Sequence, residues 1–579
     1  MLNTSVLNEL PVNSALDLAL DELTAAKDDW AQTSIEKRIA VLQAIKDCLL
    51  PIAKDWAETA GRMKGIPEDS ALVGEEWISG PYTVMSACNG LLQTLSEMQG
   101  KSFLNSLKKR KTQSGQTAVQ VLPHSIWDHL ILSGVTAEVW MKEGITADNL
   151  ASHTATSYDS PERLREGKVA LVLGAGNIAS IAPLDVFHKL FNEHQVVILK
   201  MNPVNEYLTE FLNKALKPLI DLNVLRIVKG GADVGGYLCE HPQVEEIHIT
   251  GSGASHDIIV WGFGEEGIRN KAAGTPKLNK PITSELGAVC PTIVVPGPWS
   301  AADIQFQAEN IATQKLHNSG FNCVACQMLI LPKHWDKKQT LLNSIKNTVA
   351  NLDPRKPYYP GAAERLAEFE KHSSNVLKFD RGSAPACLVS VDEDAIDDKY
   401  RMTEVFAPAL STHELADTDP EAYLIAAAKF ANQKLYGTLG ANIVIHPKTI
   451  KQIGKKRFEQ ILADLHYGTI AINTWSGLGF LTPACPWGAF PGHTLEDVQS
   501  GIGFAHNTYM FDSSERVVVQ APWRPFPRNL LSGDMTLLPK PPWFVSNKKQ
   551  HKTAMLLTRF QHTPSWLKLP RIFFNALLG

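Results

Sequence analysis

Apolar residues recur at helical spacing along residues 14–60, with charged residues between them. A spacing of three to four residues brings these side chains to one face, which predicts a pair of amphipathic helices. The apolar positions are Trp30, Ile39, Leu42, Ile45 and Leu49. Residues 117–141 instead alternate apolar and polar side chains around Pro123 and Gly134, a pattern typical of two strands of a hairpin.

After Gly167 the chain changes to a repeated order of strand, turn, helix and strand. Strands separated by helices predict an α/β architecture with a parallel sheet. The helix after the first strand is expected to extend through Leu190, and the alternation continues through Ile472 without an internal repeat. The predicted strands of this region cover residues 169–173, 195–199, 225–228 and 247–250.

The chain has 579 residues, which is too long for one hydrophobic core and suits two or three domains. Its 44% hydrophobic and 20% charged residues support large cores, and the net charge of −4 gives no electrostatic reason to expect nucleic acid as a partner. Eight cysteines are scattered along the chain, and its start is not a basic, apolar leader. We therefore expect a reducing, cytoplasmic location rather than a disulfide framework. No apolar run in the sequence reaches the ~18 residues of a transmembrane helix.

Cys323 stands on a polar turn that contains Gly320 and precedes the apolar run 328–332. A thiol at the edge of a strand is partly exposed, and local dipoles can stabilise its thiolate, so Cys323 is a candidate nucleophile. Upstream, Glu285 enters a turn before another predicted strand. A buried glutamate near a thiol is a candidate general base.

Cys326 follows Cys323 at a spacing that also occurs in redox dithiols and zinc sites. No second pair of Cys or His residues lies nearby at ligand spacing, and the motif precedes a strand-like run rather than opening a helix. We therefore predict no metal site and interpret Cys326 as a packed neighbour.

Residues 174–179 follow a predicted strand and open a helix, and their sequence fits G-x-G-x-x-A. This is the fingerprint of dinucleotide binding, so the turn taken by itself would hold a pyrophosphate group.

Several segments resemble motifs of the aldehyde dehydrogenase superfamily. Residues 285–291 are similar to its E-L-G-G-x-x-P pattern, with Ala288 at the second glycine. Residues 320–323 are similar to its G-Q-x-C pattern, with different residues at 321–322. Further motifs follow in the order of the family, so the resemblance covers residues 30–503.

The resemblance implies an α/β, aldehyde dehydrogenase-like fold with a Rossmann-type cofactor domain, an α/β catalytic domain and a β-hairpin oligomerisation element. The cofactor domain is expected at residues 1–116 and 146–284, and the catalytic domain at residues 285–480. Residues 117–145 and 481–534 are expected to bridge the subunits of a homodimer or homotetramer.

The resemblance also implies roles for three side chains: Cys323 as nucleophile, Glu285 as the base that activates water, and Asn177 as a donor to the oxyanion. The turn that carries Asn177 keeps its competing interpretation as a pyrophosphate turn. We prefer the oxyanion role because the remaining motifs then fall in the order of the family.

A cofactor site is implied at a further set of matching positions, which are Lys200, Pro203, Thr250, Gly251, Ser252, Glu404 and Phe406. In the family, the lysine binds the adenosine ribose, the T-G-S segment lies near the pyrophosphate, and the glutamate and phenylalanine lie at the nicotinamide end. Pro203 stands where many NAD-preferring members have a glutamate, so the cofactor is NAD or NADP and the choice stays open.

The expected reaction is NAD(P)-dependent oxidation of an aldehyde to a carboxylic acid through a thiohemiacetal and a thioester on Cys323. One alternative is a CoA-acylating aldehyde dehydrogenase or acyl-CoA reductase, which would not need Glu285 as a base. The other is a non-catalytic scaffold of the same fold, which the departures from the motifs favour. Several aromatic residues suggest a bulky or long-chain hydrophobic aldehyde: Trp475, Phe480 and Trp487.

Residues 535–579 form a C-terminal tail with seven basic residues and no acidic ones. Its last stretch, residues 566–578, is short, basic and amphipathic, as in segments that lie on anionic membranes. Three roles stay open for this tail: packing on its own or a neighbouring subunit, peripheral contact with a membrane, and a wall of the substrate entrance.

Overall fold

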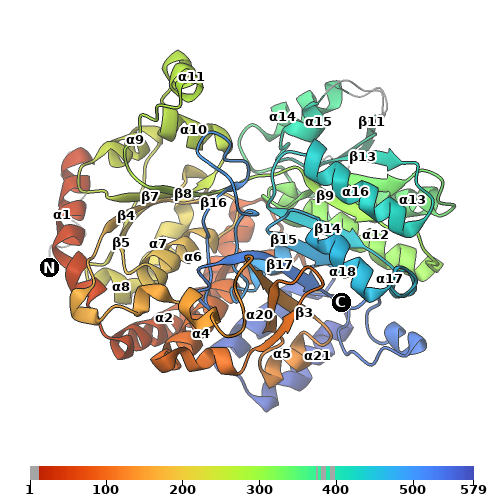
Figure 1. Cartoon of the computed structure of the whole chain (residues 1–579), viewed down its shortest axis with the longest axis horizontal. Coiled ribbons are helices and arrows are strands. Elements are labelled where there is room, and N and C mark those ends of the chain that lie inside the picture. Colours follow the sequence, from red (N-terminus) through yellow and green to blue (C-terminus); the bar gives the residue numbers. More distant parts are fainter. Residues whose placement is uncertain (1–11, 373–375, 380–385, 391–397) are drawn as a thin grey trace.

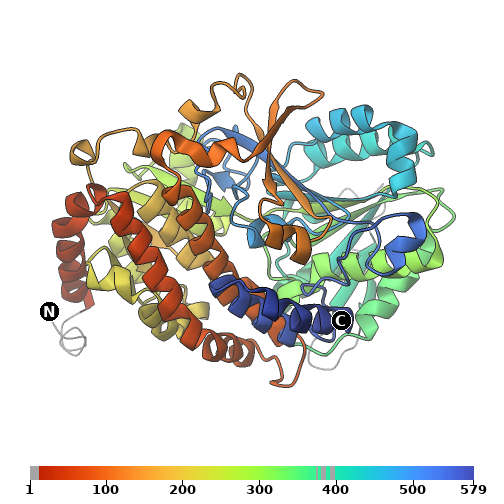
Figure 2. The ribbon, with the colours of Figure 1, turned by 90° about the horizontal axis from the view of Figure 1, so that it is seen from below.

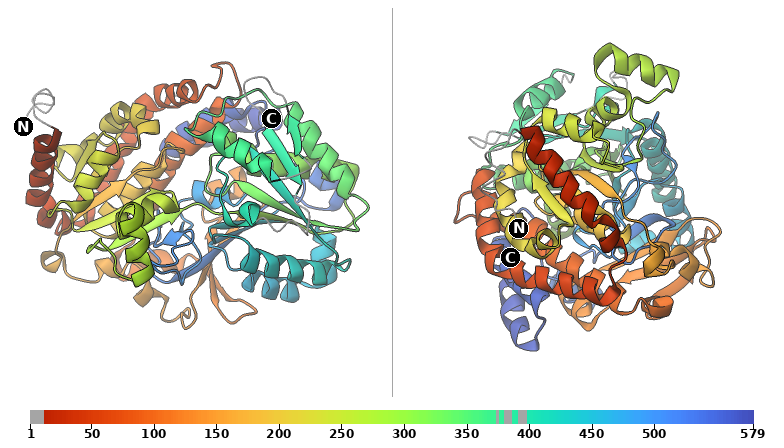
Figure 3. Two further views of the ribbon diagram at one scale, coloured as in Figure 1. Left: turned by 90° about the horizontal axis from the view of Figure 1, so that it is seen from above. Right: turned by 90° about the vertical axis from the view of Figure 1, so that its left-hand side faces the viewer.

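The computed structural model describes residues 12–372, 376–379, 386–390 and 398–579, and for residues 386–390 it describes the backbone only. Two β-sheets lie side by side, each covered by helices, and the C-terminal helices pack beneath them in the view of Figure 1. Figure 3 shows the same arrangement from above and from one side, with helix α11 (Gly264–Ala273) projecting from the body.

The first sheet has six strands in the order β16-β8-β7-β4-β5-β6. All neighbouring strands are parallel except the β16–β8 pair, which is antiparallel. The predicted strands of this region are confirmed to within a residue or two at their ends, because their continuous apolar runs are buried in the sheet. The strands are β4 Val169–Leu173, β5 Val196–Lys200, β6 Leu225–Val228, β7 Glu246–Gly251, β8 Ile282–Leu286 and β16 Gly501–Ile502.

Helices cover both faces of this sheet, and the predicted helical pair of residues 14–60 is present as α1 and α2. Ser34 caps α2 by accepting a hydrogen bond from the backbone N–H of Lys37, which defines where the second helix begins. The helix after β4 begins at Ile181, later than predicted, and turns into the π-helical η6 at His188. The helices are α1 Val12–Ala31, α2 Ile35–Met63, α3 Val73–Trp77, η1 Ile78–Tyr82, α4 Thr83–Ser96, α6 Ile181–Phe187, η6 His188–Asn192, η7 Pro203–Leu208, α7 Thr209–Ala215, α8 Lys217–Asp221, α9 Ala232–Glu240 and α10 Gly253–Trp261.

The second sheet has eleven strands in the order β1-β2-β3-β17-β15-β14-β9-β10-β13-β12-β11. Its centre is parallel, and the chain passes from β8 of the first sheet to β9 of this centre between Leu286 and Cys290. The predicted hairpin of residues 117–141 is present as the antiparallel pair β2 and β3, which joins the sheet through β17. The strands are β1 Lys108–Lys111, β2 Thr117–Leu122, β3 Thr136–Met141, β9 Cys290–Val294, β10 Cys326–Pro332, β11 Val376–Phe379, β12 Ala386–Ser390, β13 Ala409–Leu415, β14 Gly440–Val444, β15 Thr469–Ile472 and β17 Ser514–Gln520.

Four of the helices around the second sheet, α5, α12, α16 and α17, begin at side-chain caps. Ser300 and Asp303 form a capping box at the start of α12, in which each side chain accepts from the backbone N–H of the other residue. The helices are α5 Ile126–Ile131, α12 Ala301–Leu316, η8 His317–Gly320, α13 Lys338–Ala350, α14 Ala362–Lys371, α15 Lys399–Met402, α16 Pro420–Lys434, α17 Pro447–Ile453, α18 Lys455–Ala463 and α19 Gly477–Leu481.

The C-terminal tail packs on the N-terminal helices, and Figure 2 shows α20 (Gln550–His562) alongside them. A Cβ atom on Gly74 of α3 would lie 2.5 Å from the backbone carbon of Gln550, so this close approach requires glycine. The shorter α21 (Leu569–Leu577) then folds back against α20. Within the residues described, no helix has both the length and the apolar character needed to cross a bilayer.

Candidate active site

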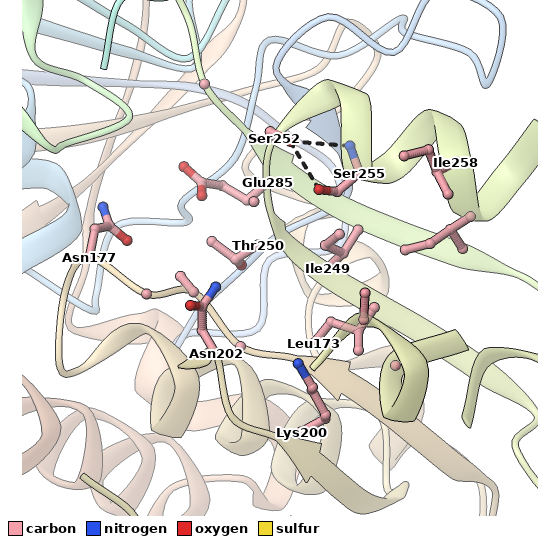
Figure 4. Close-up of a pocket in the computed structure, with 18 of the residues that line it drawn as sticks. Leu173, Asn177, Lys200, Asn202, Ile249, Thr250, Ser252, Ser255, Ile258 and Glu285 are labelled. Atoms are coloured by element: carbon pink, nitrogen blue, oxygen red, sulfur yellow. Dashed lines mark hydrogen bonds between the residues drawn. The ribbon is translucent and has the colours of Figure 1, made fainter. Parts of the chain in front are cut away.

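A cavity of about 600 Å³ lies between the two sheets. One wall comes from the carboxyl ends of β4, β5, β7 and β8, and the other from the loop before β10 and the segment before β13. Asn177 and Glu285 lie towards one end of this cavity and Lys200 towards the other (Figure 4). The predicted site residues that line it are Asn177, Lys200, Thr250, Gly251, Ser252, Glu285, Cys323, Glu404 and Phe406.

Pro203 does not line this cavity, and its neighbour Asn202 does. Pro203 occupies the first position of η7 and is exposed, because the side chain of Asn202 caps that turn by accepting from the backbone N–H of Val204. The cavity wall beside Lys200 therefore carries the side-chain amide of Asn202. The carboxylates among the lining residues are Glu285 and Glu404, from β8 and the segment before β13.

The Cys323 loop is held in an unusual backbone conformation. Asn318 and Ser319 have φ angles of 54° and 56°, and Gly320 has a φ of 81°. A Cβ atom on Gly320 would lie 2.9 Å from the carbonyl oxygen of Ala407, so glycine fits both the φ angle and the space. The thiol of Cys323 is partly exposed, whereas the neighbouring Cys326 is buried.

Glu285 lies beside this thiol on β8 and is only 3% exposed. Its Oε1 accepts a hydrogen bond of 3.3 Å from the indole Nε1 of Trp487. Burial raises the pKa of Glu285 to about 7, although hydrogen bonds from Cys323 and Trp487 oppose this shift. Burial and the Glu285 carboxylate also raise the pKa of the Cys323 thiol. A carboxylate with this pKa can take a proton near neutral pH.

Asn177 brings an amide to the same place. Its Nδ2 donates to the carbonyl oxygen of Phe321 at 2.9 Å, and the side chain is buried. Because an amide nitrogen carries two hydrogens, this bond leaves one N–H for a ligand at Cys323. The bond also fixes the turn after β4 to the nucleophile loop.

A buried network of charged residues supports this loop from behind. Arg355 contacts Glu75 at 2.6 Å, and the same Glu75 carboxylate accepts from the backbone N–H of Asn318 at 2.9 Å. Lys64 pairs with Glu76 at 3.0 Å and donates to the carbonyl oxygen of Asn177 at 2.8 Å. The four charged side chains are each at most 5% exposed.

The sequence analysis missed this network, since its members are far apart in the chain. One available signal was the pair of adjacent carboxylates Glu75 and Glu76 inside the apolar run 72–78. Adjacent acidic residues in such a run indicate buried charges that must find cationic partners.

The wall near β13 presents Glu404 and Phe406. The carboxylate of Glu404 covers Gly287, where a Cβ atom would lie 1.8 Å from its Oε2. Burial raises the pKa of Glu404 to about 8, and the charge of Glu285 adds to this shift. Phe406 has a φ of 41°, and the guanidinium of Arg365 holds its carbonyl oxygen at 3.0 Å. Such strained residues persist where surrounding contacts fix them, often at ligand sites.

The cavity fits a dinucleotide in size and in the groups that it offers. Its volume is within the usual range for ligand sites of about 300–1,000 Å³. Ser252 caps α10 by accepting from the backbone N–H of Ser255 at 3.1 Å, at the end of β7 that faces the cavity. At the other wall, the buried Oε1 of Glu404 has no hydrogen-bond partner in the described part of the chain, which suits a ligand hydroxyl.

A ligand cavity at the carboxyl edge of a parallel sheet is typical of nucleotide-binding proteins, and here it faces a second α/β unit that carries Cys323. Residues 195–363 match the aldehyde dehydrogenase family. Aldehyde dehydrogenase family 3 member F1 of Arabidopsis thaliana is 25% identical over 370 residues, which are 60% of this chain and 68% of that relative.

Solved aldehyde dehydrogenase structures share this fold. A Mycobacterium tuberculosis aldehyde dehydrogenase complexed with NAD+ aligns with a TM-score of 0.57 and 16% identity, covering 87% of this chain and 90% of that one. The NADP-dependent glyceraldehyde-3-phosphate dehydrogenase of Bacillus halodurans, complexed with NADP, aligns with a TM-score of 0.56 and 19% identity, covering 87% and 90%.

Over residues 195–363 the chain is thus similar to the aldehyde dehydrogenase family, and the predicted α/β fold is confirmed by the solved structures that share it.

We expect Arg355→Met to destabilise the protein by about 3–5 kcal/mol, because it leaves Glu75 charged and buried without its cation. Urea unfolding measures this loss. Arg457→Met is the matched control, since Arg457 pairs with Glu421 at the surface, where both side chains are at least 37% exposed. Breaking such a surface pair costs about 1 kcal/mol or less. Equal stability of the two variants would contradict the importance of the buried network.

Proposed function

We propose that this protein oxidises aldehydes to carboxylic acids through covalent catalysis at Cys323. The observation that carries the proposal is the pairing of a partly exposed thiol with a buried glutamate whose pKa lies at about 7. Both side chains line the cavity that fits the dinucleotide. Oxidation of the aldehyde to a thioester needs a thiol beside a cofactor site, and hydrolysis of that thioester needs a base beside the same thiol.

The first step is attack of the Cys323 thiolate on the aldehyde carbon, after the thiol has released its proton to solvent. The carbonyl oxygen becomes an alkoxide, for which the backbone N–H of Cys323 and the free N–H of Asn177 are the proposed donors. This role for Asn177 is supported by its bond to Phe321, which places the amide next to the nucleophile. The same turn, residues 174–177, also lines the cofactor cavity, which supports its alternative role in binding pyrophosphate.

A bound NAD or NADP would supply the hydride acceptor that converts the thiohemiacetal into a thioester. We assign its binding to Lys200 at the adenosine end, Thr250, Gly251 and Ser252 near the pyrophosphate, and Glu404 with Phe406 at the nicotinamide end. The glycine positions around α9 support a close approach of the ligand, since Gly236 has open space at its Cβ position.

The last step is hydrolysis of the thioester. Glu285 takes a proton from water, the hydroxide adds to the acyl carbon, and the sulfur leaves as the carboxylic acid forms. Water therefore supplies the second oxygen of the product. A base with a pKa of about 7 is half ionised near neutral pH, so hydrolysis should speed up as the pH rises through 7.

Transfer of the acyl group to CoA is the second candidate function. Such a transfer needs no base for water, and the buried Glu285 therefore favours hydrolysis. A non-catalytic scaffold would have no reason to keep Cys323 partly exposed beside Glu285 while Cys290 and Cys326 are buried.

We expect Cys323→Ala to lower aldehyde oxidation by more than roughly 10³-fold, because losing the nucleophile costs more than losing one oxyanion donor. Binding of NAD(P), followed by fluorescence, should persist. Cys326→Ala is the matched control and should keep most of the activity. Inactivity of the Cys326 variant with an active Cys323 variant would overturn the assignment.

We expect Glu285→Gln to release a rapid burst of reduced cofactor followed by slow turnover, because the thioester still forms and its hydrolysis loses the base. The remaining rate should no longer rise through pH 7. Stopped-flow absorbance with and without CoA measures both properties. A fully active variant without a burst would remove the hydrolytic step and favour acyl transfer.

We further propose peripheral membrane contact through the tip of the tail. Its exposed apolar residues lie next to basic ones, a combination suited to anionic lipid surfaces. Leu567 is 92% exposed and is followed by Lys568, and Phe574 is 65% exposed and lies three residues after Arg571. Assembly through residues 117–145 and 481–534 and a cytoplasmic location stay predictions.

We expect the full chain to sediment with anionic vesicles, less so as the salt concentration rises, because salt screens the basic residues. Leu567→Glu should weaken this binding about tenfold or more, since burying a leucine side chain is worth ~1.5–3 kcal/mol. Leu531→Glu is the control, because Leu531 is 87% exposed but lies outside the tail. Equal effects of the two variants, or no sedimentation, would leave the tail tip without a membrane role.

A further inference from the structure

A second, smaller cavity also reaches Cys323. Its walls are mostly apolar and aromatic, and it includes Phe480, Trp475 and Trp487 around the sulfur. Glu285 and Asn177 line it as well, so it opens onto the reacting atoms. A substrate carbonyl at Cys323 would therefore direct its carbon chain into this inner cavity.

An outer apolar cavity shares Leu481 with the inner one and is built largely by the C-terminal tail. Trp543, Phe573 and Ala576 of the tail line it together with Tyr82 of η1. Lys540 is a charged residue in this wall, and its ammonium is neutralised by Glu309 at 3.0 Å. Buried apolar walls of this kind favour hydrocarbon over water.

Leu481 at the end of α19 lines both cavities and forms the wall between them. Ile78 and Ser79 of η1 are adjacent in the chain. Ile78 lines the outer cavity and Ser79 lines the inner one. The Leu481 side chain and the first turn of η1 therefore lie between the two spaces. A rotation of the Leu481 side chain would join them into one path.

The volumes limit what this path could hold. The inner cavity offers about 30 Å³ and the outer about 60 Å³, as space open to the centre of a water-sized group. Each such group needs about 10–15 Å³ of this space, so the inner cavity holds roughly two or three and the outer roughly four to six. A methylene group is about as large as a water molecule.

We propose that the inner and outer cavities form one binding site for the hydrocarbon chain of the aldehyde, with the C-terminal tail as its outer wall and Leu481 as the gate. The site selects unbranched aliphatic aldehydes of about six to nine carbons. This inference rests on the proposed aldehyde oxidation and names its substrate class.

The first test compares kcat/KM of the wild-type protein for propanal, hexanal, octanal, decanal and tetradecanal. Each buried methylene is worth ~0.8 kcal/mol, so kcat/KM should rise about fourfold per carbon and level off near nine carbons. A kcat/KM independent of chain length would overturn the inference and leave the proposed oxidation intact. No oxidation of any member of the series would instead overturn the proposed oxidation.

The second test blocks or enlarges the outer cavity. Ala576→Trp should lower the octanal-to-propanal ratio of kcat/KM at least tenfold, because the indole fills space meant for the chain. Phe573→Ala should move the preferred chain length to longer aldehydes. The controls Leu577→Trp and Phe574→Ala change neighbouring residues that are 51% and 65% exposed, and both should leave the ratio and the preferred length unchanged.

Circular dichroism and thermal unfolding check that each variant is folded. If Ala576→Trp does not fold, Phe573→Ala and the wild-type series still decide the question. Ratios that change equally in the cavity variants and in their surface controls would overturn the assignment of the outer cavity to the substrate chain.

Discussion

The position of the nucleophile depends on charges that the fold buries next to it. Arg355 and Lys64 come from segments far apart in the chain, and each meets a carboxylate of α3 in a place without solvent. A buried charge without its partner costs several kcal/mol, so these pairs act as geometric constraints on the segments that carry them. The backbone N–H of Asn318 and the carbonyl of Asn177 are fixed by the same side chains.

Two kinds of buried carboxylate therefore lie near Cys323, one paired with a cation and one without. Glu75 has a cation at 2.6 Å, and the Arg355 charge lowers its pKa despite its complete burial. Glu285 is also buried, yet it has an indole N–H and a thiol as neighbours instead of a cation, and its pKa rises. The carboxylates paired with cations fix the positions of the neighbouring segments, and Glu285, which is hydrogen-bonded to neutral groups, keeps a proton affinity suited to catalysis.

The sequence predicts those features that rest on local pattern. The strands around residues 169–250 follow from continuous apolar runs, and Cys323 and Glu285 follow from polar turns beside such runs. The network could not be predicted, because Lys64, Glu75 and Arg355 become neighbours only in the folded chain. The sequence predicted Pro203 at the cavity, but its neighbour Asn202 lines it instead. Asn202 is the N-cap of η7, and Pro203 is the first residue of that helix. Packing of the tail on its own subunit was among the predicted roles, but its docking point could not be predicted because nothing in the sequence pattern marks Gly74.

Helix α3 connects the two parts of the molecule that the proposed chemistry needs. Its Gly74 admits the backbone of α20, and its next two residues are the carboxylates that hold the nucleophile loop. The tail, whose residues line the outer cavity, is therefore docked one residue away from the charges that position Cys323. A side chain larger than hydrogen at position 74 would displace the tail and the neighbouring carboxylates at once. We therefore expect the shape of the substrate path and the position of the Cys323 thiol to be coupled through α3.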